Sequence, residues 1–120
     1  MIRVIAIGDI HGCSKTLKYL LLKKLKITRS DKIYCIGDYI DRGPDSKGVI
    51  DLIIKLRKEG FQLHTIRGNH EEMMMQSINN QKFFDKWMQN GGDATLKSFN
   101  ISSYNELPSK YKFFFKRTKY

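Results

Sequence analysis

The rest of the chain is organised around the stretch Gly37-Asp38-Tyr39-Ile40-Asp41-Arg42-Gly43. It follows an apolar run at 33–36 and places two carboxylates and a guanidinium between two glycines. Glycine lets the backbone turn sharply and approach a bound group closely. Carboxylate oxygens are ligands for hard divalent cations, and a guanidinium presents a planar fork that suits phosphate oxygens. The stretch therefore predicts a loop that holds a cation and an oxyanion.

Two further motifs flank the central one, Gly8-Asp9-Ile10-His11-Gly12 upstream and Gly68-Asn69-His70-Glu71 downstream. Asp38 lies 29 residues after Asp9 and 31 residues before Asn69. Each interval is about the length of one strand–helix–strand repeat. Such repeats return all three loops to one edge of a parallel sheet, which is where open α/β sheets bind ligands.

The hydrophobic pattern predicts an α/β fold. The predicted strands are 3–7, 32–36 and 61–66, the first two of them apolar enough to be buried on both faces. A helix capped by Ser14 is expected to follow the first strand, and a helix capped by Asp45 or Ser46 is expected to end at Gly60. The order strand–helix–strand–helix–strand implies parallel pairing and right-handed crossovers.

After His70 the pattern becomes helical. The predicted helices are 71–78, 80–89, a short one capped by Asp93 that runs through Phe99, and one opened by Pro108. Trp87 and the phenylalanines are interpreted as core residues rather than stacking platforms for bases. His64, on the third strand, is interpreted as a packing or surface residue.

The composition is that of a globular protein with an unusual charge. An apolar fraction of 41% and a charged fraction of 28% are ordinary, so we expect one domain over residues 1–120. The formal net charge is +10, which favours anionic partners or keeps the protein soluble. Cys13 and Cys35 lack a CxxC spacing, so we expect reduced thiols and a cytoplasmic protein. No run approaches the roughly 18 apolar residues of a membrane span, and no membrane partner is expected.

The three loops contain residue types suited to a pair of divalent cations. Asp9 and His11 are two positions apart, so on an extended loop they face the same way and can hold one ion. Asp38 can bridge that ion to a second one, to which Asn69 can add its amide oxygen. The pair of ions against two carboxylates leaves a net charge of about +2, which suits a phosphate dianion. A water bridging the ions would lose a proton readily and become the nucleophile.

The same loops contain groups suited to catalysis. His70 is adjacent to Asn69, so on an extended backbone the two side chains point to different sides, which leaves His70 to protonate the leaving oxygen. Asp41 is a candidate to hold the imidazole in its charged form. Arg42 is expected to bind the non-bridging phosphate oxygens. Each motif alone could be a turn with a satisfied histidine, but the three in order predict hydrolysis of a phosphoester.

These motifs resemble the signature GDxHG, GDxxDRG and GNHE of the phosphoprotein phosphatase family of calcineurin-like metallophosphoesterases. Glu71-Glu72-Met73-Met74 and the pattern Trp87…Asn90-Gly91-Gly92…Thr95-Leu96 are similar to its bacterial and phage serine/threonine phosphatase branch. The resemblance implies a four-layer α/β/β/α sandwich, of which this chain is the N-terminal half, βαβαβ followed by helices. It implies two divalent ions, with Mn²⁺ expected and Fe, Zn or Ni as alternatives.

The resemblance also assigns roles to single residues. It implies Asp9, His11 and Asp38 as ligands of the first metal, Asp38 and Asn69 as ligands of the second, His70 paired with Asp41 as general acid, and Arg42 as phosphate ligand. The related diadenosine tetraphosphatases usually lack the Asp before the Arg-Gly of the middle motif, so Asp41 favours a serine/threonine protein phosphatase. A nucleotide hydrolase of the bis(5′-nucleosyl)-tetraphosphatase type is the alternative within the class. A non-catalytic module that binds phosphate or nucleic acid is the alternative outside it.

The resemblance covers about the first half of a family member. The family needs two further histidines on the second metal, whereas this sequence has three histidines in total, at 11, 64 and 70. We therefore expect a truncated domain, a degenerate short protein or a site completed in trans, and weak or absent hydrolysis by this chain alone. A phosphorylated protein or a small phosphoester is the expected substrate, nucleic acid is not expected as a partner, and an exposed apolar sheet face favours a homodimer.

Overall fold

A three-stranded parallel sheet lies at the centre of the computed structural model, which describes residues 2–119. The strands are β1 (Val4–Ile7), β2 (Lys32–Cys35) and β3 (Gln62–Thr65), in the order β1-β2-β3. Ile33 of β2 pairs with Ile5 on one side and with Leu63 on the other. The predicted parallel α/β arrangement is confirmed, with strands slightly shorter than the apolar runs.

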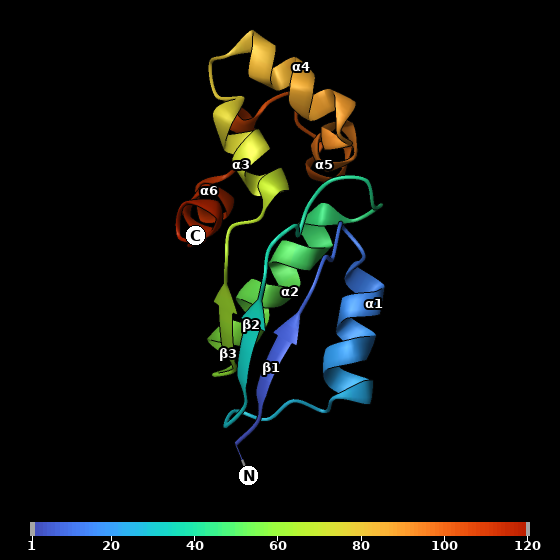
Figure 1. Ribbon diagram of the computed structural model, residues 1–120, viewed down its shortest axis with the longest axis vertical. Helices are drawn as coiled ribbons and strands as arrows, with labels where there is room; N and C mark the ends of the chain where they lie inside the picture. Colours follow the sequence, from blue (N-terminus) through green and yellow to red (C-terminus); the bar gives the residue numbers. More distant parts are fainter. Residues whose placement is uncertain (1, 120) are drawn as a thin grey trace.

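Both crossover helices cover the same face of the sheet (Figure 1). They are α1 (Ser14–Tyr19), which continues into a π-helical segment at Leu20–Lys24, and α2 (Ser46–Lys58). Because the strand order follows the chain order, two right-handed crossovers must lie on one side. The fully buried Leu21, Ile33 and Ile53 belong to the core between this face and the helices.

The opposite face of the sheet is exposed, as the half-length resemblance predicted, whereas the prediction from the apolar runs, that the strands are buried on both faces, is wrong. Along β1 and β2, buried or partly buried residues such as Ile7 and Cys35 alternate with exposed ones. Val4 is 71% exposed, and Ile36, directly after β2, is 49% exposed. The one-sided crossovers leave this face without a covering layer among residues 2–119, so the described chain forms two layers, helix and sheet.

The remaining helices gather beyond the carboxyl ends of the strands, with α6 beside the end of β3 (Figure 1). They are α3 (Asn69–Gln76), α4 (Gln81–Gln89), α5 (Gly92–Phe99) and α6 (Ser109–Lys116), with a 3-10 turn at Tyr104–Glu106. Trp87 and Phe115 are fully buried, which confirms their predicted core role, whereas Phe113 is 61% exposed and does not belong to the core. His64 is exposed on β3 and stacks on Tyr34, as expected of a surface residue. Within residues 2–119, the helices all fall short of the length and hydropathy that crossing a bilayer requires.

The predicted N-cap residues of the helices are confirmed only in part. Asp45 caps α2, accepting a hydrogen bond from the Gly48 N–H at 2.9 Å. Ser14 does not cap α1, because its hydroxyl donates instead to Asp45 Oδ2 at 2.6 Å and ties the two helix starts together. Asp93 does not cap α5 either. It lies in the first turn, and Gly91, with a φ of +97°, is the capping residue.

Asp31 should make the fold sensitive to acid. It is 1% exposed and accepts two hydrogen bonds from Arg3, at 2.7 and 3.1 Å, and one from the Thr28 N–H. The Arg3 contacts, followed by the Thr28 N–H, hold the pKa of Asp31 well below its ordinary value. A depressed carboxylate pKa adds stability above the unfolded pKa, and that stability is lost as pH falls toward the folded pKa.

We therefore expect Asp31→Asn to lower the urea midpoint at pH 6 and to flatten its fall between pH 5 and pH 2. The exposed Asp93→Asn is the control and should keep the wild-type pH profile. Circular dichroism across a urea series measures both. Parallel profiles for wild type and Asp31→Asn would contradict the assignment.

Candidate active site

Backbone hydrogen bonds join the first and second loops at the carboxyl end of the sheet. The Asp38 carbonyl accepts from the N–H groups of Ile10 and His11 at 3.0 and 2.9 Å, and the Tyr39 carbonyl accepts from Gly12 at 2.8 Å. The prediction that these loops meet at one sheet edge is confirmed.

Glu71 joins the second loop to the third. Its buried carboxylate accepts from the backbone N–H groups of Asp38, Tyr39 and Gly68 at 2.7, 2.8 and 2.9 Å. Burial raises the pKa of Glu71 to about 7, and the three N–H donors act against that shift. No role was predicted for Glu71 from the sequence. An acid at the last position of the third motif, directly after two candidate site residues, could have indicated one.

Two glycines allow the loops to touch backbone to backbone. A Cβ on Gly37, whose φ is +109°, would lie 2.5 Å from the Gly68 Cα. A Cβ on Gly43 would lie 1.8 Å from the His11 carbonyl oxygen. Any side chain at either position would therefore separate loops that must stay in contact.

Asp9, His11 and Asp38 come together as a candidate metal site. One ligand atom from each lies within 4.8 Å of the others. The His11 Nδ1 is 2.9 Å from the Ile40 carbonyl, which can only accept, so Nδ1 carries the proton and Nε2 is left with its lone pair. That Nε2 is 3.9 Å from Asp9 Oδ2. The prediction of an extended loop is wrong, because His11 has a φ of +41°. The side chains of Asp9 and His11 are brought together by this turn, not by the two-residue alternation of an extended backbone.

The start of α3 reaches the same carboxylate. The His70 N–H donates to Asp38 Oδ1 at 3.0 Å, and the exposed Asn69 is the first residue of the helix. The backbone at 69–70 is helical, not extended as predicted. Neighbouring side chains still diverge, because successive helical residues are rotated by about 100°. Asn69 and His70 can therefore take different roles at one helix start.

Asp41 lies at the centre of a buried hydrogen-bond network. Its Oδ2 is 2.7 Å from His70 Nδ1 and accepts from the Trp87 indole N–H at 2.8 Å. Its Oδ1 accepts from the Thr95 hydroxyl at 2.6 Å, and the Thr95 Oγ1 accepts in turn from the Asp41 N–H at 2.8 Å. Burial raises the pKa of Asp41, and the three side-chain donors oppose the shift. Trp87 and Thr95 thus support the pair that sequence reasoning proposed from Asp41 and His70.

Within residues 2–119, the network leaves His70 Nε2 as the ring nitrogen without a hydrogen-bond partner. The His70 ring is 7% exposed and stands edge-on to the His11 ring, with 4.7 Å between the ring centres. The candidate general acid is therefore adjacent to a candidate metal ligand. Such a position suits proton transfer to a group that is bound at the metal site.

Arg42 is exposed beside this network. Its N–H donates to the Gly91 carbonyl at 3.1 Å, and among residues 2–119 no carboxylate pairs with its guanidinium. Arg42 has a φ of +69°, and four of the seven non-glycine residues with positive φ in the described chain belong to the first two loops: His11, Asp38, Asp41 and Arg42. Left-handed backbone costs free energy and persists where the surroundings impose it, typically at functional sites.

Comparison with known proteins identifies the family. The model of the calcineurin-like phosphoesterase family matches residues 2–119. Serine/threonine-protein phosphatase 1 of Salmonella typhimurium is 37% identical over 91 residues, which are 72% of this chain and 38% of that protein. The asymmetrical bis(5′-nucleosyl)-tetraphosphatase PrpE of Oceanobacillus iheyensis is 31% identical over 113 residues, 88% of this chain and 45% of that protein.

A solved structure shows the same fold. The 1.1 Å structure of a cold-active protein tyrosine phosphatase superposes with a TM-score of 0.61 at 23% identity, covering 87% of this chain and 34% of that one. At this identity the likeness concerns the fold alone. The chain spans less than half the length of each of these relatives.

Replacing Glu71 tests whether its carboxylate holds the loops together. Glu71→Gln keeps the shape but turns an NH₂ group toward backbone N–H donors, and a buried donor left unsatisfied costs about 1–3 kcal/mol. We expect the free energy of unfolding in urea to fall by about 2 kcal/mol. The exposed Glu59→Gln is the matched control and should behave as wild type. Equal stability of Glu71→Gln and wild type would show that the loops are held in another way.

Proposed function

Because the chain belongs to the calcineurin-like phosphoesterase family, we propose that it is the N-terminal part of a metal-dependent phosphomonoester hydrolase acting on phosphoserine and phosphothreonine in proteins. One observation carries the proposal. The ligand atoms of Asp9, His11 and Asp38 lie within 4.8 Å of one another, beside the hydrogen-bonded pair of Asp41 and His70.

The donor set fits divalent cations of the first transition row, with Mn²⁺ proposed first and Fe, Zn and Ni as alternatives. Asp9, His11 and Asp38 would hold one ion, and Asp38 and Asn69 would offer oxygens to a second. The tautomer of His11 is already suited to ligation, since its Nδ1 is used by the Ile40 carbonyl. When bound, the ions would supply Lewis acidity and an activated water as nucleophile.

Side chains of the protein would protonate the leaving group and bind the phosphate. Asp41 orients His70 through Nδ1, so that the imidazolium form would present its Nε2–H to the leaving serine or threonine oxygen. Arg42, exposed and unpaired with any carboxylate in the described chain, would bind the non-bridging phosphate oxygens. A guanidinium next to the developing charge lowers the barrier electrostatically.

Asp41 favours a protein phosphatase over a nucleotide hydrolase, because the diadenosine tetraphosphatases that the motifs also resemble usually lack an Asp at this position. Its carboxylate has three side-chain donors, so the loop is built around that residue. Relatives of both types match the chain, one named a serine/threonine-protein phosphatase and one a bis(5′-nucleosyl)-tetraphosphatase. Hydrolysis of dinucleoside tetraphosphates is therefore the second candidate, and a fragment that binds phosphate without catalysis is the third.

We also propose that this chain alone hydrolyses phosphoesters weakly or not at all. From the described residues, the second ion would receive Asp38 and Asn69, and the remaining histidine, His64, is stacked on Tyr34 at the sheet surface. Two oxygen ligands hold a divalent ion poorly compared with the six or so that such ions prefer.

Metal binding gives a test that does not need turnover. In a Mn²⁺ titration followed by electron paramagnetic resonance, wild type should bind Mn²⁺, and Asp38→Asn should weaken binding at least tenfold because it removes a charged ligand shared by both ions. His64→Asn replaces the exposed histidine and is the control. Wild-type affinity in Asp38→Asn would place the metal elsewhere.

Turnover tests the substrate. With Mn²⁺ present, a phosphothreonine peptide, a dinucleoside tetraphosphate and a chromogenic phosphomonoester should be compared by kcat/KM, with the peptide expected to be preferred. His70→Asn should lower any measured kcat at least about a hundredfold, the usual contribution of a general acid. His64→Asn should leave kcat unchanged. Preference for the dinucleoside tetraphosphate would overturn the proposed substrate, and an active His70→Asn would overturn the proposed acid.

The exposed sheet face supports the proposal of a homodimer of this chain. Val4, Ala6 and Ile36 present apolar groups there without a covering layer among residues 2–119. We expect sedimentation to show a dimer that Val4→Lys with Ile36→Lys converts to monomer, because burying two lysines costs more than the contact provides. A monomeric wild type at about 100 μM, where even weak interfaces of μM affinity are occupied, would remove this proposal.

A further inference from the structure

The pattern Trp87…Gly91-Gly92…Thr95 spans the end of α4 and most of α5, and both of its outer residues contact the central loop. The Trp87 indole N–H donates to Asp41 Oδ2 at 2.8 Å, and the Thr95 hydroxyl donates to Asp41 Oδ1 at 2.6 Å. A Cβ on Gly92 would lie 2.7 Å from the indole ring, so glycine leaves the indole the room it occupies. The pattern thus brings two donors to one buried carboxylate.

A buried serine at the start of α2 belongs to the same network. Ser46 is fully buried, although Asp45 and not Ser46 caps the helix. The Ser46 Oγ accepts from the Asp41 N–H at 3.2 Å and lies 3.2 Å from Thr95 Oγ1. A buried hydroxyl without hydrogen bonds is costly, and these two contacts are those that Ser46 makes among the described residues.

The donor inventory fixes the direction of each hydrogen bond around Thr95. A hydroxyl has one proton, and that of Thr95 is used in the 2.6 Å bond to Asp41 Oδ1. Ser46 must therefore be the donor in its contact with Thr95. The two lone pairs of Thr95 Oγ1 accept from the Ser46 hydroxyl and, at 2.8 Å, from the Asp41 N–H. The two hydroxyls thus form a relay that ends on the carboxylate.

This relay sets both the backbone and the side chain of Asp41. Its N–H and its Oδ1 bind the same Thr95 hydroxyl, while the backbone has a φ of +75°. Oδ1 is held by Thr95 and Oδ2 by Trp87, so a rotation of the carboxylate would break both bonds. In the orientation that remains, Oδ2 lies 2.7 Å from His70 Nδ1.

Helix docking alone does not explain the Thr95 hydroxyl. One turn further along α5, the Ser98 hydroxyl accepts from the Lys47 N–H at 2.9 Å. This bond joins α5 to the first turn of α2 and does not involve Asp41. The two helices therefore have a hydrogen bond of their own beside the one that continues to the carboxylate.

We propose that Ser46, Thr95 and Trp87 are positioning residues for the Asp41 carboxylate. They hold its Oδ2 toward His70 Nδ1 and so keep the imidazole in one orientation. They would act on proton transfer only through Asp41, so they are not catalytic residues themselves. The relevance to catalysis rests on the proposed function, whereas the geometry can be measured without turnover.

The Nδ1–H proton of His70 reports this geometry in a proton NMR spectrum of the ¹⁵N-histidine-labelled chain, at neutral pH in EDTA and without substrate. An N–H bound to a carboxylate at 2.7 Å resonates far downfield, and a ring that is 7% exposed exchanges its proton slowly with water. We expect the resonance in wild type and its loss in His70→Asn, which assigns it. Thr95→Val removes the hydroxyl and should abolish the resonance, and Thr95→Ser should restore it.

Two further variants separate positioning from stability. Ser98→Ala removes the bond between α5 and α2 and should lower the urea midpoint while leaving the resonance in place. Ser46→Ala removes the donor to Thr95 and should shift the resonance upfield, which also provides the test if Thr95→Val does not fold. An unmoved resonance in folded Thr95→Val or Ser46→Ala would overturn the proposal.

Loss of the resonance in Ser98→Ala would also overturn the proposal, because the role would then be helix docking. A wild type without the resonance would show that Asp41 is not held toward His70, with the same consequence. Failure of the chain to hydrolyse any phosphoester would contradict the proposed function, and it would leave the outcome of this experiment unchanged.

Discussion

The candidate active site depends on one buried carboxylate that is shared between backbone N–H groups of two loops. Glu71, in the first turn of α3, accepts from the N–H groups of Asp38, Tyr39 and Gly68. Those donors have no strand or helix to satisfy them, and an unsatisfied buried N–H is costly. The carboxylate therefore holds the loop that follows β2 against the loop that follows β3. The position of Asp38, the carboxylate expected between the two metals, follows from that attachment.

Packing and chemistry are combined at Asp41. Trp87 is fully buried in the core, yet its indole N–H donates to the carboxylate that orients His70. Thr95 on α5 contacts the same carboxylate and the Asp41 N–H. The helices beyond the sheet thus have a second task besides covering apolar surface, since they hold the candidate acid and its partner in one geometry. The left-handed backbone at Asp41 and Arg42 persists because its N–H groups are held by hydrogen bonds. The Asp41 N–H donates to the Thr95 hydroxyl, and the Arg42 N–H donates to the Gly91 carbonyl.

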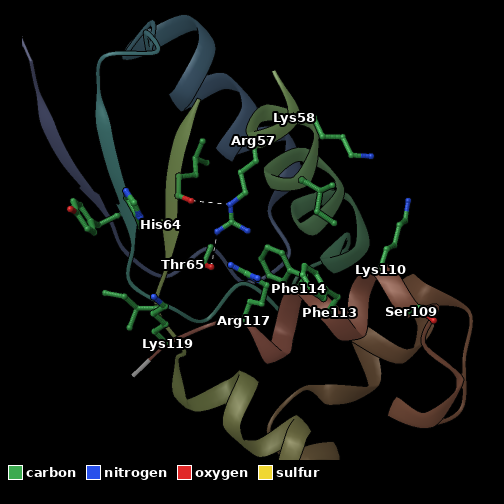
Figure 2. A pocket seen from close by; sticks show the side chains of 14 residues that line it. Arg57, Lys58, His64, Thr65, Ser109, Lys110, Phe113, Phe114, Arg117 and Lys119 are labelled. Atoms are coloured by element: carbon green, nitrogen blue, oxygen red, sulfur yellow. Dashed lines mark hydrogen bonds between the residues drawn. The ribbon is translucent and has the colours of Figure 1, made fainter. Parts of the chain in front are cut away.

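Charged residues of two kinds gather at different parts of the sheet. At the carboxyl ends of the strands, carboxylates and imidazoles are gathered, and phosphate could be attracted there only through bound cations and Arg42. Along the outer edge of β3, between that strand, α2 and α6, lysines and arginines line a groove without a carboxylate among its described lining residues (Figure 2). The first arrangement suits chemistry on a phosphoryl group, whereas at the second the chain pairs Lys119 with Thr65 at the end of β3 and with Arg67 just after it.

The sequence by itself determined the parallel βαβαβ order, the convergence of three loops and the identity of their polar residues. Apolar runs at strand length, glycines at turns and intervals of about thirty residues are local or periodic signals that survive without coordinates. Only the tertiary structure decided that His11 turns through a left-handed backbone and that Glu71, Trp87 and Thr95 hold the site. The physical reason is that these features arise from groups far apart in the chain. Thr95 lies 54 residues from the Asp41 that it contacts, and no periodic pattern in the sequence records such a hydrogen bond.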